Sequence, residues 1–183
     1  DADTDADTDT DPPPCGGTPP GPTWCDDQDA SLRACWTFNT LGSTRTVVDE
    51  SSYGHNGSPT SGMGVGPGVV GSALLNDGTG LVDIGDPPGL DITTVTAEGW
   101  VKVDSTPVGR MGVIDHDGQW GIFVRQNLSL YCSMGGTTDS GPATIPLGEW
   151  THFACVHDGA NRTLYVNGTL VSTVAATVLN PAS

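Results

Sequence analysis

Short runs rich in Val, Ile, Thr and aromatic residues recur from Leu32 onward, separated by clusters of Gly, Asn, Asp and Pro every eight to twelve residues. This spacing is typical of an antiparallel β-sandwich, because each run is long enough for one strand and each cluster for one reversal. No window of eleven or more residues shows a convincing 3.6-residue period, so we expect almost no helix. The predicted strands are residues 32–38, 73–76, 81–84, 95–103, 111–115, 121–125, 129–133, 151–157, 162–166 and 170–174.

Turn signals support this reading. Two β-branched runs flank an Asn-Gly pair, and a type I′ hairpin turn needs positive φ at both of its central residues. Asp-Gly pairs mark two further reversals. The three dipeptides are Asn167-Gly168, Asp158-Gly159 and Asp117-Gly118.

The first thirty residues differ in composition from the rest of the chain. They hold nine of the 22 acidic residues and no Lys, Arg or Glu, and they begin with the run DADTDADTDTD. Dense like charge with almost nothing apolar to bury predicts a disordered Asp/Pro/Gly-rich linker at residues 1–30, followed by a sandwich domain at residues 31–183. A calcium loop is the alternative for this run, but the glycine and the closing glutamate of such a loop are missing.

The charge balance excludes two classes of partner. The net charge is −16 with only 6 Lys and Arg residues. Nucleic acids need a basic footprint, and anionic membrane surfaces need a basic patch, and the chain offers neither. No stretch approaches the roughly 20 apolar residues of a transmembrane helix, so we predict no membrane span.

Five cysteines indicate an oxidising, extracellular or cell-surface location, because they show no CxxC pair and no Cys/His metal spacing. Free thiols in a cytosolic domain are the alternative. Cys132 and Cys155 lie in strands expected to be antiparallel neighbours, where Cβ atoms come close to disulfide distance. We therefore predict a Cys132–Cys155 disulfide. A second disulfide, Cys25–Cys35, is favoured because both residues flank the start of the fold, which leaves Cys15 over.

Aromatic and histidine side chains give further expectations. Trp36, Trp100 and Trp150 each lie in or beside an apolar run, so we expect them in the core, where a tryptophan removes a large apolar area from water. His157 stands beside a predicted turn, and we expect it to be solvated.

Five segments in this order and spacing resemble a LamG-like jellyroll domain of the concanavalin A-like lectin/glucanase architecture: ACWTFN, VVDESSYGHNGS, GSALLNDGTGLVDIGD, LDITTVTAEGWVKVD and LGEWTHFACVHDGANRTLYVNGTLV. The resemblance covers about residues 32–174. It implies a non-catalytic recognition module that binds carbohydrate or acts in adhesion on a secreted or surface-anchored protein. Its partners would be glycans or extracellular proteins, and it would be a monomeric module of a longer chain. The family's closing strand has no counterpart after Val174, which predicts that the sequence is cut before its last strand.

The implied ligand surface combines aromatic side chains with polar ones, since such sets hold sugars on loops or on a concave sheet. The alternative for Trp120 and Tyr131 is that they only pack. The candidate residues are Asp115, His116, Asp117, Trp120, Arg125 and Tyr131.

The resemblance also implies a calcium site, built from loop oxygens of Asp49, Ser51 and Asn56, with Asp77 approaching from a neighbouring turn. The alternative is that these side chains make local turn hydrogen bonds. The family's closing strand often adds an acidic ligand, and its absence lowers the expected affinity.

Glucanases of the same architecture carry their catalytic acids as Glu-x-Asp-x-x-Glu. The three glutamates of this chain, Glu50, Glu98 and Glu149, have no other acid two residues away. Asp115 and Asp117 have the spacing of a retaining hydrolase, but they lie in a predicted turn. We therefore expect no enzyme. A passive spacer or a protein-interaction domain is the other alternative to glycan recognition.

The linker prediction has a direct test. Ordering one residue costs about 1–2 kcal/mol of backbone entropy, and the linker offers little apolar area in return. Limited proteolysis should therefore trim the chain to a stable core that begins between Cys15 and Leu32. Protection of the amides of residues 1–11 from hydrogen exchange would contradict the prediction.

Overall fold

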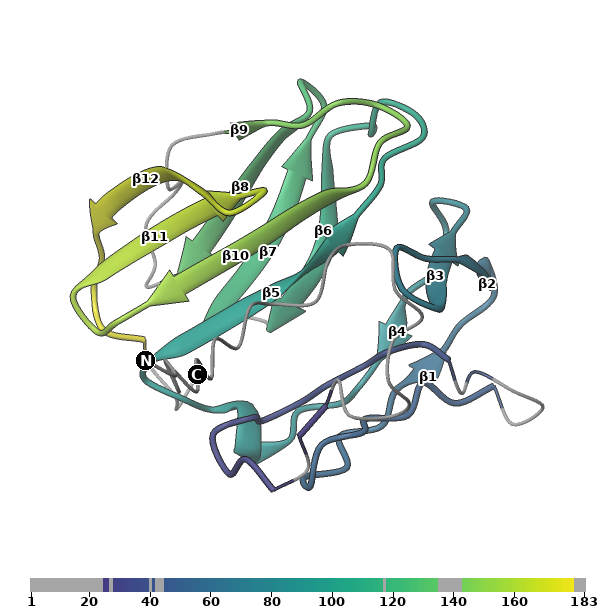
Figure 1. Cartoon of the computed structure of the whole chain (residues 1–183), viewed down its shortest axis with the longest axis horizontal. Helices are drawn as coiled ribbons and strands as arrows, with labels where there is room; N and C mark the ends of the chain where they lie inside the picture. The colour runs from purple at the N-terminus through teal and green to yellow at the C-terminus, as the bar shows by residue number, and fades with distance from the viewer. Residues whose placement is uncertain are drawn as a thin grey trace, which may run out of the picture.

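The structure is a computed structural model that describes residues 25–26, 28–39, 41, 45–116, 118–134 and 143–179. Over these residues the protein is an antiparallel β-sandwich of the jelly-roll type, as the sequence predicted (Figure 1). The helical structure of this part is limited to one 3-10 turn, η1 (Pro88–Leu90). Residues 1–24, which hold most of the predicted linker and Cys15, lie outside the described residues, and so does Asp117.

The strands of the described part are short. Their bounds are β1 Ser58–Pro59, β2 Met63–Pro67, β3 Ser72–Asn76, β4 Val82–Asp83, β5 Val95–Val101, β6 Arg110–His116, β7 Trp120–Arg125, β8 Ser129–Met134, β9 Ala143–Thr144, β10 Thr151–His157, β11 Asn161–Val166 and β12 Thr169–Ala175. Two four-stranded sheets, in the orders β12-β11-β10-β5 and β6-β7-β8-β9, lie one behind the other in Figure 1. The two-stranded pairs β1-β4 and β2-β3 lie beside them.

Two differences from the predicted strands have local causes. Residues 32–38 do not form a strand, because their backbone meets a loop: the Cys35 carbonyl accepts from the Glu50 amide, and the Cys35 amide donates to the Asp49 side chain. The sequence prediction also missed the two-residue strands β1 and β9, and it missed β2, whose residues MGVGP are rich in the glycine and proline that usually mark turns.

The predicted Asn-Gly hairpin turn joins β11 to β12. Asn167 has φ 48° and Gly168 has φ 74°, the left-handed conformation that a type I′ turn requires at both positions. The turn also docks onto β10, because the Asn167 amide donates to the His152 carbonyl and the Asn167 Oδ1 accepts from the His152 amide, both at 2.9 Å.

The core lies between the two four-stranded sheets. Strand residues alternate between an inner face, toward the other sheet, and an outer face. On β7 and β8 the inner side chains come from every second residue, and their counterparts on β10 and β11 face them. This inner set includes Trp120, Ile122, Val124, Leu130, Cys132, Met134, Phe153, Cys155 and Leu164.

Two disulfides link the described residues, and both confirm the predicted pairs. Cys132–Cys155 has a Cα–Cα distance of 6.0 Å, and Cys25–Cys35 one of 5.8 Å. The reason given for the first pair was wrong, since β8 and β10 belong to different sheets. The bond therefore crosses the core between the sheets instead of joining neighbouring strands.

Two side-chain predictions were wrong for the same reason, the alternation along β5 and β10. Trp100 pairs with His152 on the outer face and is 48% exposed. His157 shares the inner face with Phe153 and Cys155, is buried, and has its Nε2 atom 2.9 Å from the Thr177 carbonyl oxygen. Trp36 and Trp150 are only half-buried, so among the described residues the tryptophan that fills the core is Trp120.

The inter-sheet disulfide should carry a large part of the stability. For the 23 residues that it spans, the entropic model gives a loss of about 3 kcal/mol in the free energy of unfolding for the double variant Cys132→Ala/Cys155→Ala, measured by urea denaturation. The Cys25→Ala/Cys35→Ala variant is the comparison: the same model gives about 2.7 kcal/mol for the 10 residues that its disulfide spans, and no loss of core packing adds to it because the bond lies outside the core cluster. Both sulfur atoms are buried, so the assignment is checked in the denatured protein without reductant: alkylation of both Cys132 and Cys155 there would contradict it.

Candidate functional site

The Asp49 carboxylate organises the loop where the resemblance implied calcium. Its Oδ1 accepts hydrogen bonds from the amides of Cys35 at 2.7 Å and Ser51 at 3.0 Å. Its Oδ2 accepts from the His55 amide at 2.7 Å and from the Ser51 hydroxyl at 2.9 Å. A carboxylate offers about four lone-pair positions, so donors fill the coordination of this side chain.

The other predicted calcium ligands are engaged in the same way. The Asn56 Oδ1 accepts from the Asp49 amide at 2.9 Å. Asp77 accepts from the amide and the hydroxyl of Thr79, in its own turn. With four donors on the Asp49 carboxylate, no lone pair is left for a cation, so the loop does not fit a calcium ion as the structure arranges it. The geometry instead matches the alternative of local turn hydrogen bonds.

The pKa of Asp49 reflects this environment. Burial of the carboxyl group on its own raises the pKa, because it disfavours the charged form. The hydrogen bonds from the amides of Cys35, Ser51 and His55 and from the Ser51 hydroxyl stabilise the carboxylate, and together they outweigh burial. The pKa of Asp49 therefore lies below its ordinary value.

The structure divides the predicted ligand-binding residues between the two faces of one sheet. Arg125 and Tyr131 lie on the outer face, and so does Asp115, whose Cα partner is Gly121. His116 and Trp120 are Cα partners on the inner face, where their rings stack at 5.7 Å. Asp117 lies outside the described residues. The sequence analysis therefore combined residues of two separate sites into one predicted ligand surface.

A β-bulge in β6 causes this division. Arg110 and Gly112 pair with outer-face residues of β7, and the register then shifts between Gly112 and Ile114. An extra residue in one strand reverses the alternation beyond it. Val113 is that residue, so His116 points to the inner face instead of the outer one.

The outer face of this sheet carries a shallow hollow of about 770 Å³. Two arginines on adjacent strands border it. The Arg110 guanidinium lies 4.1 Å from the Phe123 ring centroid, and the Arg125 guanidinium lies 4.4 Å from that of Tyr131. Both rings are buried, so the guanidinium groups and not the ring faces meet the solvent. The hollow is lined by Gly109, Arg110, Arg125, Gln126, Asn127 and Tyr131.

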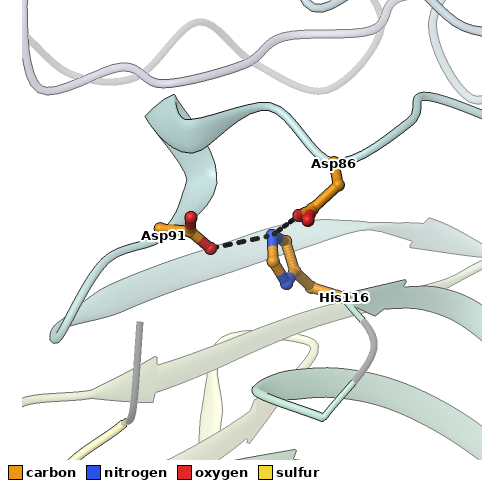
Figure 2. Close-up of side chains that lie close together, drawn as sticks. All are labelled: Asp86, Asp91 and His116. Carbon is orange, nitrogen blue, oxygen red and sulfur yellow. Dashed lines mark ion pairs between the residues drawn. The ribbon is translucent and has the colours of Figure 1, made fainter. Parts of the chain in front are cut away.

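A second cluster lies at the end of β6, where the segment between β4 and β5 passes over it. Figure 2 shows Asp86 and Asp91, on either side of η1, pointing at the same nitrogen of the His116 ring. The His116 Nε2 lies 3.8 Å from the Asp86 Oδ1 and 3.8 Å from the Asp91 Oδ1. The ligand atoms of the three residues lie within 4.8 Å of one another, so the group could hold a metal ion.

Buried polar atoms surround this cluster. Gln119 is buried, and its Nε2 donates to the Asp91 Oδ1 at 2.5 Å. Neither nitrogen of the His116 ring has a hydrogen-bond partner among the described residues. Sequence reasoning selected His116 but missed Asp86, Asp91 and Gln119. The acids of the run DPPGLD gave a weak signal, since nothing in their spacing shows which strand the run will cover.

Comparison with known families agrees with the fold. A laminin G family model of the concanavalin A-like lectin/glucanases superfamily matches residues 76–183. The chain belongs to this superfamily. The searches of curated proteins and of solved structures gave no match.

Membership in the concanavalin A-like lectin/glucanases superfamily supports a lectin-like or adhesion-type module in general. The superfamily also includes glycosidases, so membership alone does not decide between binding and hydrolysis. Two disulfides are typical of an extracellular protein. No helix in the described part of the chain is long and apolar enough to cross a membrane.

The Asp49 hydrogen bonds predict a pH-dependent contribution to stability. Hydrogen bonds to a charged group contribute about 1.5–3 kcal/mol, so Asp49→Asn should lower the free energy of unfolding at pH 7 by roughly that amount. Because the folded pKa is lowered, this contribution is present above the unfolded value of about 3.9 and is lost as the pH falls through the folded pKa. Urea denaturation at several pH values should show that the difference in the free energy of unfolding between wild type and variant becomes smaller below about pH 4.

The matched control for this variant is Asp77→Asn, at an exposed turn aspartate whose side chain accepts from the amide and the hydroxyl of Thr79, in its own turn. Its effect on the free energy of unfolding should be much smaller. An Asp49→Asn protein as stable as wild type at pH 7 would contradict our account of the loop. So would a wild type that millimolar calcium stabilises while Asp49→Asn gains nothing from the ion.

Proposed function

We propose that the protein is a non-catalytic, extracellular recognition module that binds a glycan in the hollow on the outer face of β6, β7 and β8. The observation that carries the proposal is the pair of arginines held over buried aromatic rings at this hollow. Superfamily membership supports the general class of module.

The arginine pair indicates the chemistry of the ligand. Arg110 and Arg125 are direct Cα partners on antiparallel strands, and both border the hollow. A ligand carboxylate or sulfate between the two guanidinium groups would accept bidentate hydrogen bonds. The favoured ligand is therefore a glycan with an acidic group.

The hollow supplies the neutral contacts that a sugar also needs. Gln126 and Asn127 are exposed at its edge and offer amide groups to hydroxyls. Contact with a buried ring limits the movement of each guanidinium group, which reduces the entropy lost on binding. Because the net charge of the chain is −16, a densely charged polyanion would be repelled at long range. A glycan with isolated acidic groups is the better match.

A protein-interaction role is the second candidate, and a different surface favours it. On the outer face of the other four-stranded sheet, Trp100 is 48% exposed and Leu170 is 56% exposed. Trp100 and Leu170 lie on the opposite edge strands β5 and β12, so each would be a separate apolar anchor for a partner. We favour glycan binding because the arginine pair offers fixed, directional donors.

A glycan array with neutral and acidic glycans tests the proposal on the full chain. Acidic glycans should bind, and Arg125→Ala should weaken their binding about tenfold or more, since a charged hydrogen bond contributes about 1.5–3 kcal/mol. Lys102→Ala is the matched control, because it removes one positive charge outside the hollow and should bind as wild type does.

Two results would count against the proposal. Equal glycan binding by wild type and Arg125→Ala would show that the ligand binds to a surface other than the hollow. Wild type that binds no glycan, combined with a protein partner lost in Trp100→Ala, would favour the interaction role.

A further inference from the structure

We propose that Asp86, Asp91 and His116 form a binding site for a divalent transition-metal ion, for which Zn²⁺ is the probe (Figure 2). The site lies apart from the arginine hollow and does not depend on glycan binding.

The distances suit a shared ion better than a direct hydrogen bond. The His116 Nε2 lies 3.8 Å from the Oδ1 of Asp86 and from the Oδ1 of Asp91, beyond hydrogen-bond length. In a tetrahedral zinc site with Zn–N and Zn–O bonds of about 2.0–2.1 Å, neighbouring ligand atoms are about 3.4 Å apart. The two distances to His116 are about 0.4 Å longer than this spacing. The ligand atoms of all three residues lie within 4.8 Å of one another, so binding an ion also draws the two carboxylates together, a movement that the exposed Asp86 side chain can make.

The histidine supplies an independent indication of a ligand. Its side chain is only 10% exposed, and its two ring nitrogens find no hydrogen-bond partner within the part of the chain that the structure describes. Leaving a buried polar atom without a partner is unfavourable. The Nε2 atom points at the two carboxylates, and stacking on Trp120 at 5.7 Å fixes the plane of the ring. A metal ion at Nε2 would satisfy this buried atom.

Gln119 holds the side chain of one candidate ligand, Asp91, in place. Its Nε2 donates to the Asp91 Oδ1 at 2.5 Å, the kind of contact that orients ligating carboxylates in metal sites. The cluster also has an entry path. Asp86 is 81% exposed, so an ion can reach the cluster from the solvent on that side.

The ligand set selects the class of ion. One imidazole nitrogen with two carboxylate oxygens suits zinc and related transition metals, whereas calcium and magnesium take oxygen ligands. Three protein ligands leave at least one coordination position for water or for an oxygen of a bound molecule.

Zinc binding to the full chain, with its disulfides intact, tests the site. The measurement is isothermal titration with Zn²⁺. Millimolar Ca²⁺ is present throughout, because it occupies acidic segments that offer only oxygen ligands and so suppresses zinc binding there. We expect one zinc ion per chain whose affinity falls about ten- to a hundredfold in Asp86→Asn and more in His116→Gln. Asp86→Asn is the safer variant, because the side chain is exposed and contributes little to packing.

Two variants serve as controls. Asp104→Asn removes another exposed acid, and His152→Gln removes a histidine that lies 3.9 Å from only one carboxylate, Glu98. Both should keep the zinc affinity of wild type. In wild type, Co²⁺ should produce an intense visible absorption, and Asp86→Asn should weaken it. This absorption reports metal coordination without relying on the heat measured in the titration.

Unchanged zinc affinity in both Asp86→Asn and His116→Gln would overturn the proposal. So would the absence of a stoichiometric zinc ion from wild type, in which case His116 serves only as an ion-pair partner of the two acids. Displacement of zinc by calcium would overturn the assignment to a transition metal.

Discussion

The disulfide between Cys132 and Cys155 crosses the core and fixes which faces of the two large sheets meet. Side chains alternate along a strand, so an inward Cys132 directs Tyr131 outward, and an inward Cys155 directs His152 outward. Both solvent-facing surfaces follow from this constraint. One carries Tyr131 and the arginine hollow, and the other carries Trp100 beside His152. The position of a core bond therefore decides what the module presents to a ligand.

Local signals in the sequence predicted the strands and turns well. Asn167-Gly168 adopts the predicted turn because its requirement, positive φ at two positions, is encoded in the two residues themselves. The sequence did not encode whether two strands share a sheet or face each other across the core. The Cys132–Cys155 pair was consequently right while its expected geometry was wrong. The same missing information placed Trp100 in the core, although it lies on the outer face.

The candidate sites show a similar limit. The residues of the Asp49 loop lie close together in the sequence, so their proximity was predictable, but their hydrogen bonds were not. The Cys35 amide, which fills one position on the carboxylate, comes from a segment expected to be a strand. Asp86 and Asp91 meet His116 only because the segment carrying η1 crosses the end of β6. Such contacts depend on the tertiary structure and cannot be predicted from the spacing of the residues in the sequence.

One residue of β6 links the two candidate sites. With strict alternation from Arg110, Ile114 and His116 would share the outer face with the arginines. The bulge at Val113 returns Ile114 to the core opposite Ile122 and turns His116 inward. The same shift turns Asp115 outward, beside Gly121, where an added Cβ would lie 3.1 Å from the Asp115 Oδ1. A bulge usually weakens local pairing, and here it lets a single strand serve an outer surface at one end and an inner cluster at the other. The alternation read from the sequence could not include this reversal, which is why one predicted ligand surface became two sites.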